Sequence, residues 1–115
     1  MSERDRLRAL RIGENEALFR SVNEQVRGIS TAWAVSDDTI SVVCECGTAS
    51  CVEQIQLHLA EYERIRGDGA LFVVRPGHEY ADVEDVVVRT DRYSTVRKHP
   101  GLPEEYAEAT DPRER

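Results

Sequence analysis

All three cysteines of the chain lie within eight residues, in the segment CECGTASC (44–51). Thiolate sulfur is a soft metal ligand, and it also carries thiol redox chemistry. An odd number of cysteines cannot close into intramolecular pairs. In a reducing compartment, clustered cysteines are more often metal ligands or redox groups than disulfide partners. The spacing C-x-C-x4-C therefore favours a metal site in which Cys44, Cys46 and Cys51 are three of the ligands.

A structural zinc site has four ligands, usually thiolates and imidazoles, so this cluster needs one more. We expect His78 to supply it, because it follows a rigid Pro-Gly turn (76–77) at the end of an apolar segment. His58, Glu53, His99 or a water molecule are the alternatives. The predicted metal site is therefore Cys44, Cys46, Cys51 and His78, with zinc as the cofactor.

Zinc would also stabilise the fold. Aromatic residues make up only 6% of the chain, so the core must come mainly from aliphatic side chains. Zinc binding contributes on the order of 10 kcal/mol in small zinc peptides, which would compensate for a thin core. The groups expected to orient the imidazole and to stabilise the sulfur charge are Glu79 and the backbone amides of Gly47 and Thr48.

The first 29 residues have the pattern of an amphipathic helix. Its apolar residues recur at spacings that place them on one stripe, and these are Leu7, Leu10, Leu18, Val22, Val26 and Ile29. Charged residues such as Glu16 and Arg20 occupy the remaining surface, and Gly28 is expected to end the helix. Asn15 and Asn23 lie near one face and could form hydrogen bonds across helices.

The segments that follow predict a small antiparallel sheet. TISVVCEC (39–46) reads as a strand that places Cys44 and Cys46 on the same face. Further elements are expected as a strand near 53–58, a helix near 60–66, a buried strand at 70–74 and a hairpin of strands 83–90 and 92–99. An unbroken helix over 53–66 is the alternative to the strand and helix. Trp33, in the connector 30–38, is expected at the edge of the core.

Together these elements predict an α+β fold, with an N-terminal helix and a small antiparallel sheet that carries a zinc-knuckle-like loop. Residues 1–99 are expected to form a single small domain. Residues 100–115 are rich in acidic residues and poor in apolar ones, and we expect them to form a mobile C-terminal tail.

The overall charge narrows the class of partner. The net charge is −7, from 22 acidic and 15 basic residues, which argues against a broad nucleic-acid surface. No apolar run approaches the roughly 20 residues that a membrane helix needs. The first residues, MSERDRLRALR, are too highly charged for a secretory signal. These features favour a cytoplasmic protein that contacts neither nucleic acid nor membrane.

Several runs of the chain resemble a family of small uncharacterised bacterial proteins. The runs are NEALFRSVNEQV (15–26), CECGTASC (44–51), LAEYERIR (59–66) and FVVRPGHE (72–79), with a final strand that holds Tyr93, Val96 and Lys98. They match the patterns N-E-A-L-F-R-x-V-N-E, C-E-C-x(4–6)-C and P-G-H-E, and the resemblance covers most of 12–98. It implies that Cys44, Cys46, Cys51 and His78 belong to one motif set. It implies no particular substrate.

The leading function is a cytoplasmic zinc-stabilised binding or regulatory module that acts through protein contacts. Its N-terminal helix would bind a protein partner or a second copy of the chain. The alternatives are a thiol-based redox sensor that uses the same cysteines and a small metalloenzyme. A zinc ion held by three thiolates and one imidazole is a poor Lewis acid, and the sequence has no H-E-x-x-H motif. We therefore expect a protein that is not an enzyme.

Overall fold

The computed structural model describes residues 1–32 and 38–113, so Trp33 and its expected place in the core lie outside the described residues. The described chain forms three helices and five strands. They are α1 (Glu3–Ala32), β1 (Thr39–Val43), β2 (Gln54–His58), α2 (Leu59–Arg66), β3 (Leu71–Val74), β4 (Glu84–Arg89), β5 (Ser94–Lys98) and α3 (Leu102–Ala109).

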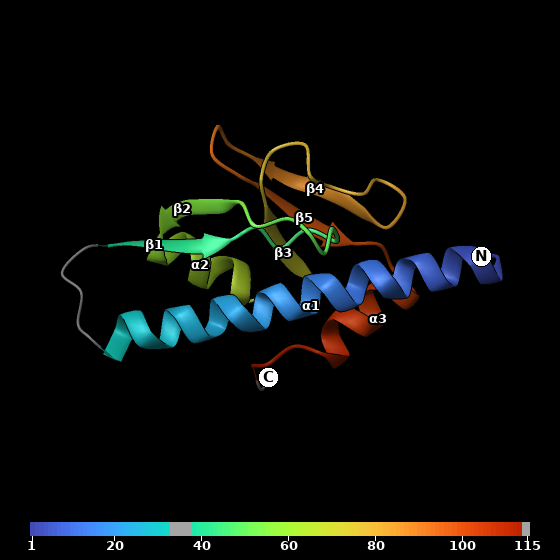
Figure 1. The fold of residues 1–115 in the computed structure, drawn as a ribbon, viewed down its shortest axis with the longest axis horizontal. Helices are drawn as coiled ribbons and strands as arrows, with labels where there is room; N and C mark the ends of the chain where they lie inside the picture. Colours follow the sequence, from blue (N-terminus) through green and yellow to red (C-terminus); the bar gives the residue numbers. More distant parts are fainter. Residues whose placement is uncertain (33–37, 114–115) are drawn as a thin grey trace.

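The strands form two antiparallel sheets, which confirms the predicted α+β class. One sheet pairs β1 with β2, and the other has the order β3-β5-β4. Helix α1 runs along the length of the molecule, with both sheets and α2 on one side of it (Figure 1). Among the described residues, no helix combines the length and the apolar content that crossing a membrane requires.

The first sheet follows the alternation in its sequence. Ile40 and Val42 of β1 and Ile55 and Leu57 of β2 are buried, while their neighbours face outward. Helix α2 begins directly after β2, where the backbone amide of His58 donates to Glu61 Oε1 at 2.9 Å. The predicted strand and short helix are confirmed. The alternative of an unbroken helix over 53–66 is wrong, because burial has a period of two in this strand.

The second sheet contains the predicted hairpin. β4 and β5 pair antiparallel with an irregularity between Val86 and Val88, and β3 pairs with the other edge of β5. Phe72, Val73, Val74 and Val96 enter the main core together with residues of the first sheet. Cys44 and Cys46 belong to the same core, so two of the predicted metal ligands are part of it rather than of an isolated loop.

Most of the predicted apolar stripe of α1 does not face the core, although one of its residues, Val26, packs against the main core. Leu7, Leu18, Val22 and Ile29 are 53%, 59%, 37% and 60% exposed, respectively. The side chains that face the body are mostly polar, and the buried ones are Ala9, Ile12, Glu16, Arg20 and Asn23. Polar partners on the sheets and loops select this face, and hydrophobic periodicity alone does not reveal them.

Helix α1 is also longer than expected. It continues through Gly28 to Ala32, so Gly28 does not end it. Gly13 lies within the helix, where a Cβ atom would stand 3.0 Å from the ring of Tyr106. The missing side chain therefore lets α3 approach α1 closely.

The C-terminal residues differ from the expected mobile tail. Residues 102–109 form α3, with a proline in its first turn, where a backbone N–H is not needed. Ala107 is buried, and Arg20 of α1 donates to its carbonyl at 2.8 Å. Arg113 pairs with Glu24 of α1 and, at 2.7 Å, with Glu63 of α2. These contacts hold the segment on the body, and composition alone does not predict them.

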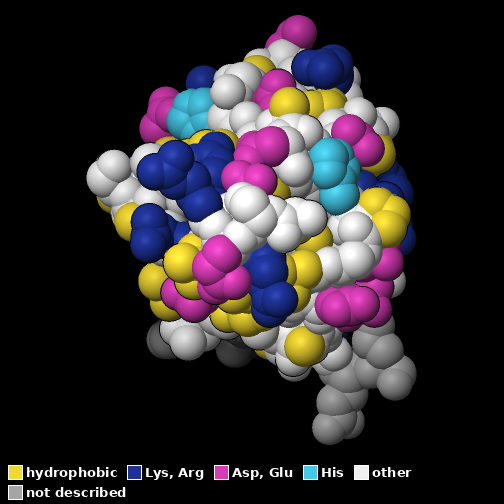
Figure 2. Space-filling view, turned by 90° about the vertical axis from the view of Figure 1, so that its right-hand side faces the viewer, with side chains coloured by type: hydrophobic (Ala, Val, Ile, Leu, Met, Phe, Trp, Pro, Cys, Tyr) yellow, Lys and Arg dark blue, Asp and Glu magenta, His cyan; other side chains and the backbone are white. Residues whose placement is uncertain are grey.

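Charge is mixed on the surface. On the face shown in Figure 2, acidic and basic side chains are interspersed. The net charge of the whole chain is −7.

Candidate metal centre

The segment that carries Cys44 and Cys46 passes from one sheet to the other. The amide of Cys44 donates to the carbonyl of Glu53 at 2.8 Å, which extends the pairing of β1 with β2. The next amide, that of Glu45, donates to the carbonyl of Val73 in β3 at 2.9 Å. Two different sheets therefore fix the backbone at these two cysteines.

Two turns bring the other candidate ligands to the same place. After Gly47 the chain turns, and the amide of Cys51 donates to the carbonyl of Thr48 at 3.0 Å. A second turn follows β3, where the amide of His78 donates to the carbonyl of Arg75 at 3.0 Å. Gly77 has a positive φ of 87°, which favours glycine at this position. The second turn directs the imidazole toward the cysteines.

The four candidate ligands converge. One ligand atom from each of Cys44, Cys46, Cys51 and His78 lies within 4.8 Å of all the others. The distances from His78 Nδ1 are 3.6 Å to Cys44 Sγ and 3.7 Å to Cys51 Sγ. In a tetrahedral site with metal–sulfur bonds of ~2.3 Å and metal–nitrogen bonds of ~2.1 Å, sulfur and nitrogen lie ~3.6 Å apart. The cluster therefore has the dimensions needed to hold one metal ion.

Backbone amides surround the sulfur atoms. The amide of Arg75 donates to Cys44 Sγ at 3.2 Å. The amides of Thr48 and Glu53 form hydrogen bonds to the sulfurs of Cys46 and Cys51, respectively. Each sulfur thus has one amide donor, an arrangement that stabilises thiolate charge. Of the expected amide donors, Thr48 occupies this role, while the contributions of Arg75 and Glu53 were not predicted.

The imidazole of His78 is oriented by a carboxylate. Its Nε2 lies 2.9 Å from Glu53 Oε2. A proton on Nε2 that is shared with Glu53 leaves the lone pair of Nδ1 pointing at the sulfurs, as a metal ligand requires. We expected Glu79 in this role, but its Oε1 atom is buried without a hydrogen-bond partner among the described residues. Glu53, an alternative fourth ligand in the sequence, instead supports the imidazole.

The thiols influence one another strongly. A hydrogen bond from Cys44 lowers the pKa of Cys46 to about 4. The same hydrogen bond, together with burial, raises the pKa of Cys44, and burial raises the pKa of Cys51. Of the three thiols, Cys46 is therefore the one that loses its proton most readily. A bound cation would replace the thiol protons of the cluster.

The other two histidines have different roles. His58 is the N-cap residue of α2 and is exposed. His99 Nε2 lies 3.1 Å from Asp85 Oδ1. Neither belongs to the Cys–His cluster.

The polar contacts between α1 and the cysteine segment were missed by sequence reasoning. Asn15 Nδ2 donates to the carbonyl of Gly47 at 2.9 Å. Asn23 Nδ2 donates to the carbonyl of Val43 at 2.8 Å, and the amide of Val43 donates back to Asn23 Oδ1 at 2.8 Å. These amides bind the loop rather than another helix. Their spacing of eight residues, near two helical turns, was the signal that both face one target.

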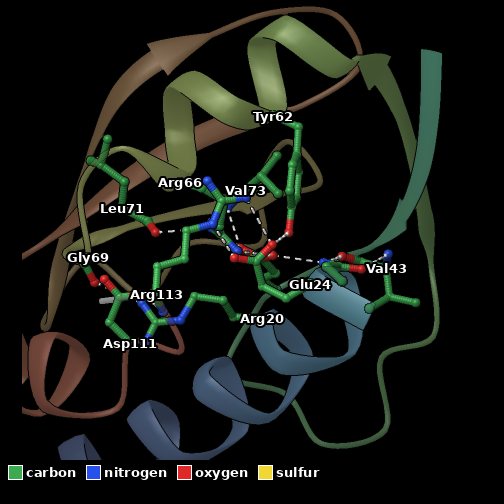
Figure 3. Close-up of polar contacts among 12 residues, drawn as sticks. Arg20, Glu24, Val43, Tyr62, Arg66, Gly69, Leu71, Val73, Asp111 and Arg113 are labelled. Atoms are coloured by element: carbon green, nitrogen blue, oxygen red, sulfur yellow. Dashed lines mark hydrogen bonds and ion pairs between the residues drawn. The ribbon is translucent and has the colours of Figure 1, made fainter. Parts of the chain in front are cut away.

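Glu45, between two candidate ligands, is fully buried and fully bonded. Arg66 donates to both of its carboxylate oxygens at 2.7 Å. The amide of Val73 donates to Oε1 at 3.0 Å, and Asn23 donates to Oε2 at 2.7 Å. Figure 3 shows Arg66 from α2 and Arg20 from α1 pointing into the layer between these helices. These four donor atoms give Glu45 a structural role.

Comparisons with protein-family models, curated proteins and solved structures found no match for this chain. The fold and the site together define a small α+β protein with a Cys3His cluster that could hold a metal ion.

Proposed function

We propose that this chain is a cytoplasmic, zinc-stabilised binding module. In it, Cys44, Cys46, Cys51 and His78 hold one Zn²⁺ ion. The observation that carries the proposal is the convergence of three sulfurs and one imidazole nitrogen within 4.8 Å of one another, with two sulfur–nitrogen distances of 3.6 and 3.7 Å. Zinc would join the loop 44–51 to the turn 75–78, which links the two sheets.

The donor set supports zinc in a structural role. Thiolate and imidazole are the usual ligands of structural zinc, and four protein ligands complete its tetrahedral shell. A catalytic site keeps one position open for water or substrate. The four converging atoms favour a structural ion over a metalloenzyme.

Metal content tests this proposal. Protein purified anaerobically should contain one zinc ion per chain by mass spectrometry of the metals. His78→Ala should lower the affinity for zinc, and His58→Ala serves as the matched control that should not. A reduced wild-type protein that takes up no zinc from solution would overturn the proposal.

We propose that the module contacts a second copy of itself through the outer face of α1. Leu7, Leu18, Val22 and Ile29 are exposed there and lie within about 60° of arc on the helix. An antiparallel pairing that sets Leu7 opposite Leu18 also sets Arg11 opposite Glu14. Both charged residues are exposed, so the pairing is complementary in charge as well as in apolar surface.

Oligomeric state tests the self-contact. Light scattering should detect a dimer whose population rises with protein concentration. Leu18→Glu should abolish it. Val87→Glu, on β4, is the matched control because Val87 is also 51% exposed. A wild-type monomer at all concentrations would overturn the self-contact and leave the zinc proposal intact.

A redox sensor is the second candidate, and the exposure of Cys51 favours it. Cys51 is half-buried, and it borders a surface hollow of about 270 Å³ that His78 and Tyr80 also line. A small oxidant such as hydrogen peroxide could approach the sulfur there.

The chemistry would take two steps. The Cys51 thiolate attacks one peroxide oxygen, so an S–O bond forms, the O–O bond breaks, and the leaving oxygen departs as water after taking up a proton. A neighbouring cysteine thiolate then attacks that sulfur, forming a disulfide and releasing a second water after protonation. The disulfide removes two ligands, so zinc is released. Stoichiometric zinc release by peroxide, lost in Cys51→Ser, would support this candidate, whereas zinc retention by the oxidised wild type would contradict it.

A further inference from the structure

We infer that Asn23 of α1 and Glu45 of the cysteine segment are positioning residues of the metal centre, so that zinc binding and the docking of α1 stabilise each other. This inference rests on the proposed zinc site. It assigns α1 a role in metal affinity, although α1 contributes no candidate ligand.

The first argument is that the cysteine segment is held from two sides. Alternate side chains of an extended segment point to opposite faces. Cys44 and Cys46 point into the ligand cluster, and Glu45 points into the buried polar layer. Any shift that separates Glu45 from its partners therefore also moves the sulfurs on either side of it.

The second argument is that Asn23 forms hydrogen bonds with two residues of this segment. Its side-chain amide forms a reciprocal pair with the backbone of Val43, with both distances at 2.8 Å. The same Nδ2 donates to Glu45 Oε2 at 2.7 Å. Asn23 is fully buried, so water cannot replace these partners. One α1 side chain thus fixes the residue before Cys44 and the residue after it.

The third argument is that a second contact closes the other end of the segment. Asn15 Nδ2 donates to the carbonyl of Gly47 at 2.9 Å. A Cβ atom at Gly47 would lie 2.5 Å from Ile12 Cγ2, so α1 and the loop are in direct contact there. Residues 43–47 therefore lie between α1 and the candidate ligand cluster.

The polar character of this interface makes the coupling strong. Apolar surfaces can shift against each other with little loss of interaction free energy, whereas a buried hydrogen bond is broken when its donor and acceptor separate. The contact that holds α1 near the site depends on amide and carboxylate groups rather than on leucine packing. Loss of the metal should therefore weaken the docking of α1 on the body. Loss of the α1 contacts should lower the affinity for the metal by the same factor, as linkage requires.

Zinc affinity of α1 variants tests the inference. We expect Asn23→Ala to weaken zinc binding by about 10- to 100-fold, the range for outer partners of metal ligands, in competition with a chromophoric chelator. Gln25→Ala is the matched control, because Gln25 is exposed on the same helix. A purely structural role would lower the stability of the zinc-free and zinc-bound forms equally and leave the affinity unchanged.

A measurement on the wild type keeps the inference testable if Asn23→Ala does not fold. Hydrogen exchange should become faster at α1 amides in 12–27 when zinc is removed, and change less in the hairpin β4–β5. Unchanged α1 exchange, or unchanged affinity in a folded Asn23→Ala protein, would overturn the inference while the zinc proposal stands. A wild type that binds no zinc would overturn both.

Discussion

Among the described residues, six Glu, Arg or Lys side chains are buried, three of them acidic and three basic. They are Glu16, Glu45, Glu84, Arg20, Arg66 and Lys98. Buried charges are tolerated when they are paired and hydrogen-bonded, and here each pairs with groups from another element. Arg20 also stacks on Phe72, with its guanidinium carbon 4.6 Å from the ring centre.

Arg66 is the residue on which Glu45 depends most. We expect Arg66→Met to lower the free energy of unfolding by about 3–5 kcal/mol, because it leaves a buried carboxylate without its partner. Arg64→Met, two residues away and exposed, should change it by less than about 0.5 kcal/mol. Urea denaturation measures both. Equal effects of the two substitutions would show that Glu45 does not need the ion pair.

Glu16 should make stability depend on pH. Lys98 Nζ donates to Glu16 Oε1 at 2.6 Å and to Glu84 Oε1 at 2.9 Å, so one cation faces two carboxyl groups. Burial, and then the neighbouring Glu84, raise the pKa of Glu16 well above its ordinary value. At pH values between the two pKa values, the Glu16 carboxyl group therefore holds its proton in the folded chain and releases it in the unfolded chain.

The sign of this effect follows from linkage. Because the raised pKa belongs to the folded state, this contribution to the free energy of unfolding is largest at low pH. It declines as pH rises above the ordinary pKa of a glutamate. Glu16→Gln should reduce the difference in the free energy of unfolding between about pH 5 and pH 8. Urea denaturation measures this difference, with the metal content of the protein kept the same at both pH values. A variant with the wild-type difference would contradict the assignment.

At the scale of elements, helix α1 docks by close approach and polar contacts rather than by its apolar stripe. Helix α1 presents Gly13 to Tyr106 of α3 and Ile12 to Gly47 of the cysteine loop. Each contact needs a residue without a side chain. Helix α1 can therefore lie near its neighbours although its buried side chains are few and mostly polar.

Two glycine substitutions separate this packing effect from helix propensity. Gly47→Ala should destabilise the protein by about 1–3 kcal/mol, because the new Cβ atom would lie 2.5 Å from Ile12 Cγ2. Gly28→Ala should stabilise it by up to about 1 kcal/mol, because Gly28 lies within α1 with nothing within 4 Å of its Cβ position. Denaturant midpoints measure both. A neutral Gly47→Ala would show that the loop can move away from α1.

At the scale of the whole molecule, the candidate metal centre lies where the two sheets meet. The segment 43–47 touches β2, β3 and α1, and Cys44 and Cys46 belong to the main core. An ion at this place would restrain elements from both halves of the chain at once.

Chelation should therefore affect global stability. A ligand at 100 times its Kd adds about 2.7 kcal/mol, which for a chain of this size corresponds to a Tm shift of roughly 10 °C. We expect a zinc chelator to lower the Tm by at least this amount, measured by calorimetry under reducing conditions. The same chelator saturated with zinc beforehand is the control. An unchanged Tm would mean that the ion does not stabilise the fold.

The sequence by itself determined the features that depend on neighbouring residues. Alternating or continuous runs of apolar and β-branched residues predicted the strands and the hairpin β4–β5. The spacing of Cys44, Cys46 and Cys51 indicated a metal site, and the Pro-Gly turn before His78 favoured this histidine, which the structure places beside the sulfurs. These signals are local, because backbone geometry relates residues a few positions apart.

Only the tertiary structure decided which face of α1 is buried and that the C-terminal segment folds. Asn23 binds Glu45 22 positions away, and Arg20 binds Ala107 87 positions away. The tertiary structure likewise brings the Glu53 carboxylate next to His78 Nε2, because the segments that carry these two residues lie side by side. Polar side chains are buried only when distant partners satisfy them, and a chain read by hydrophobic periodicity does not show where those partners lie.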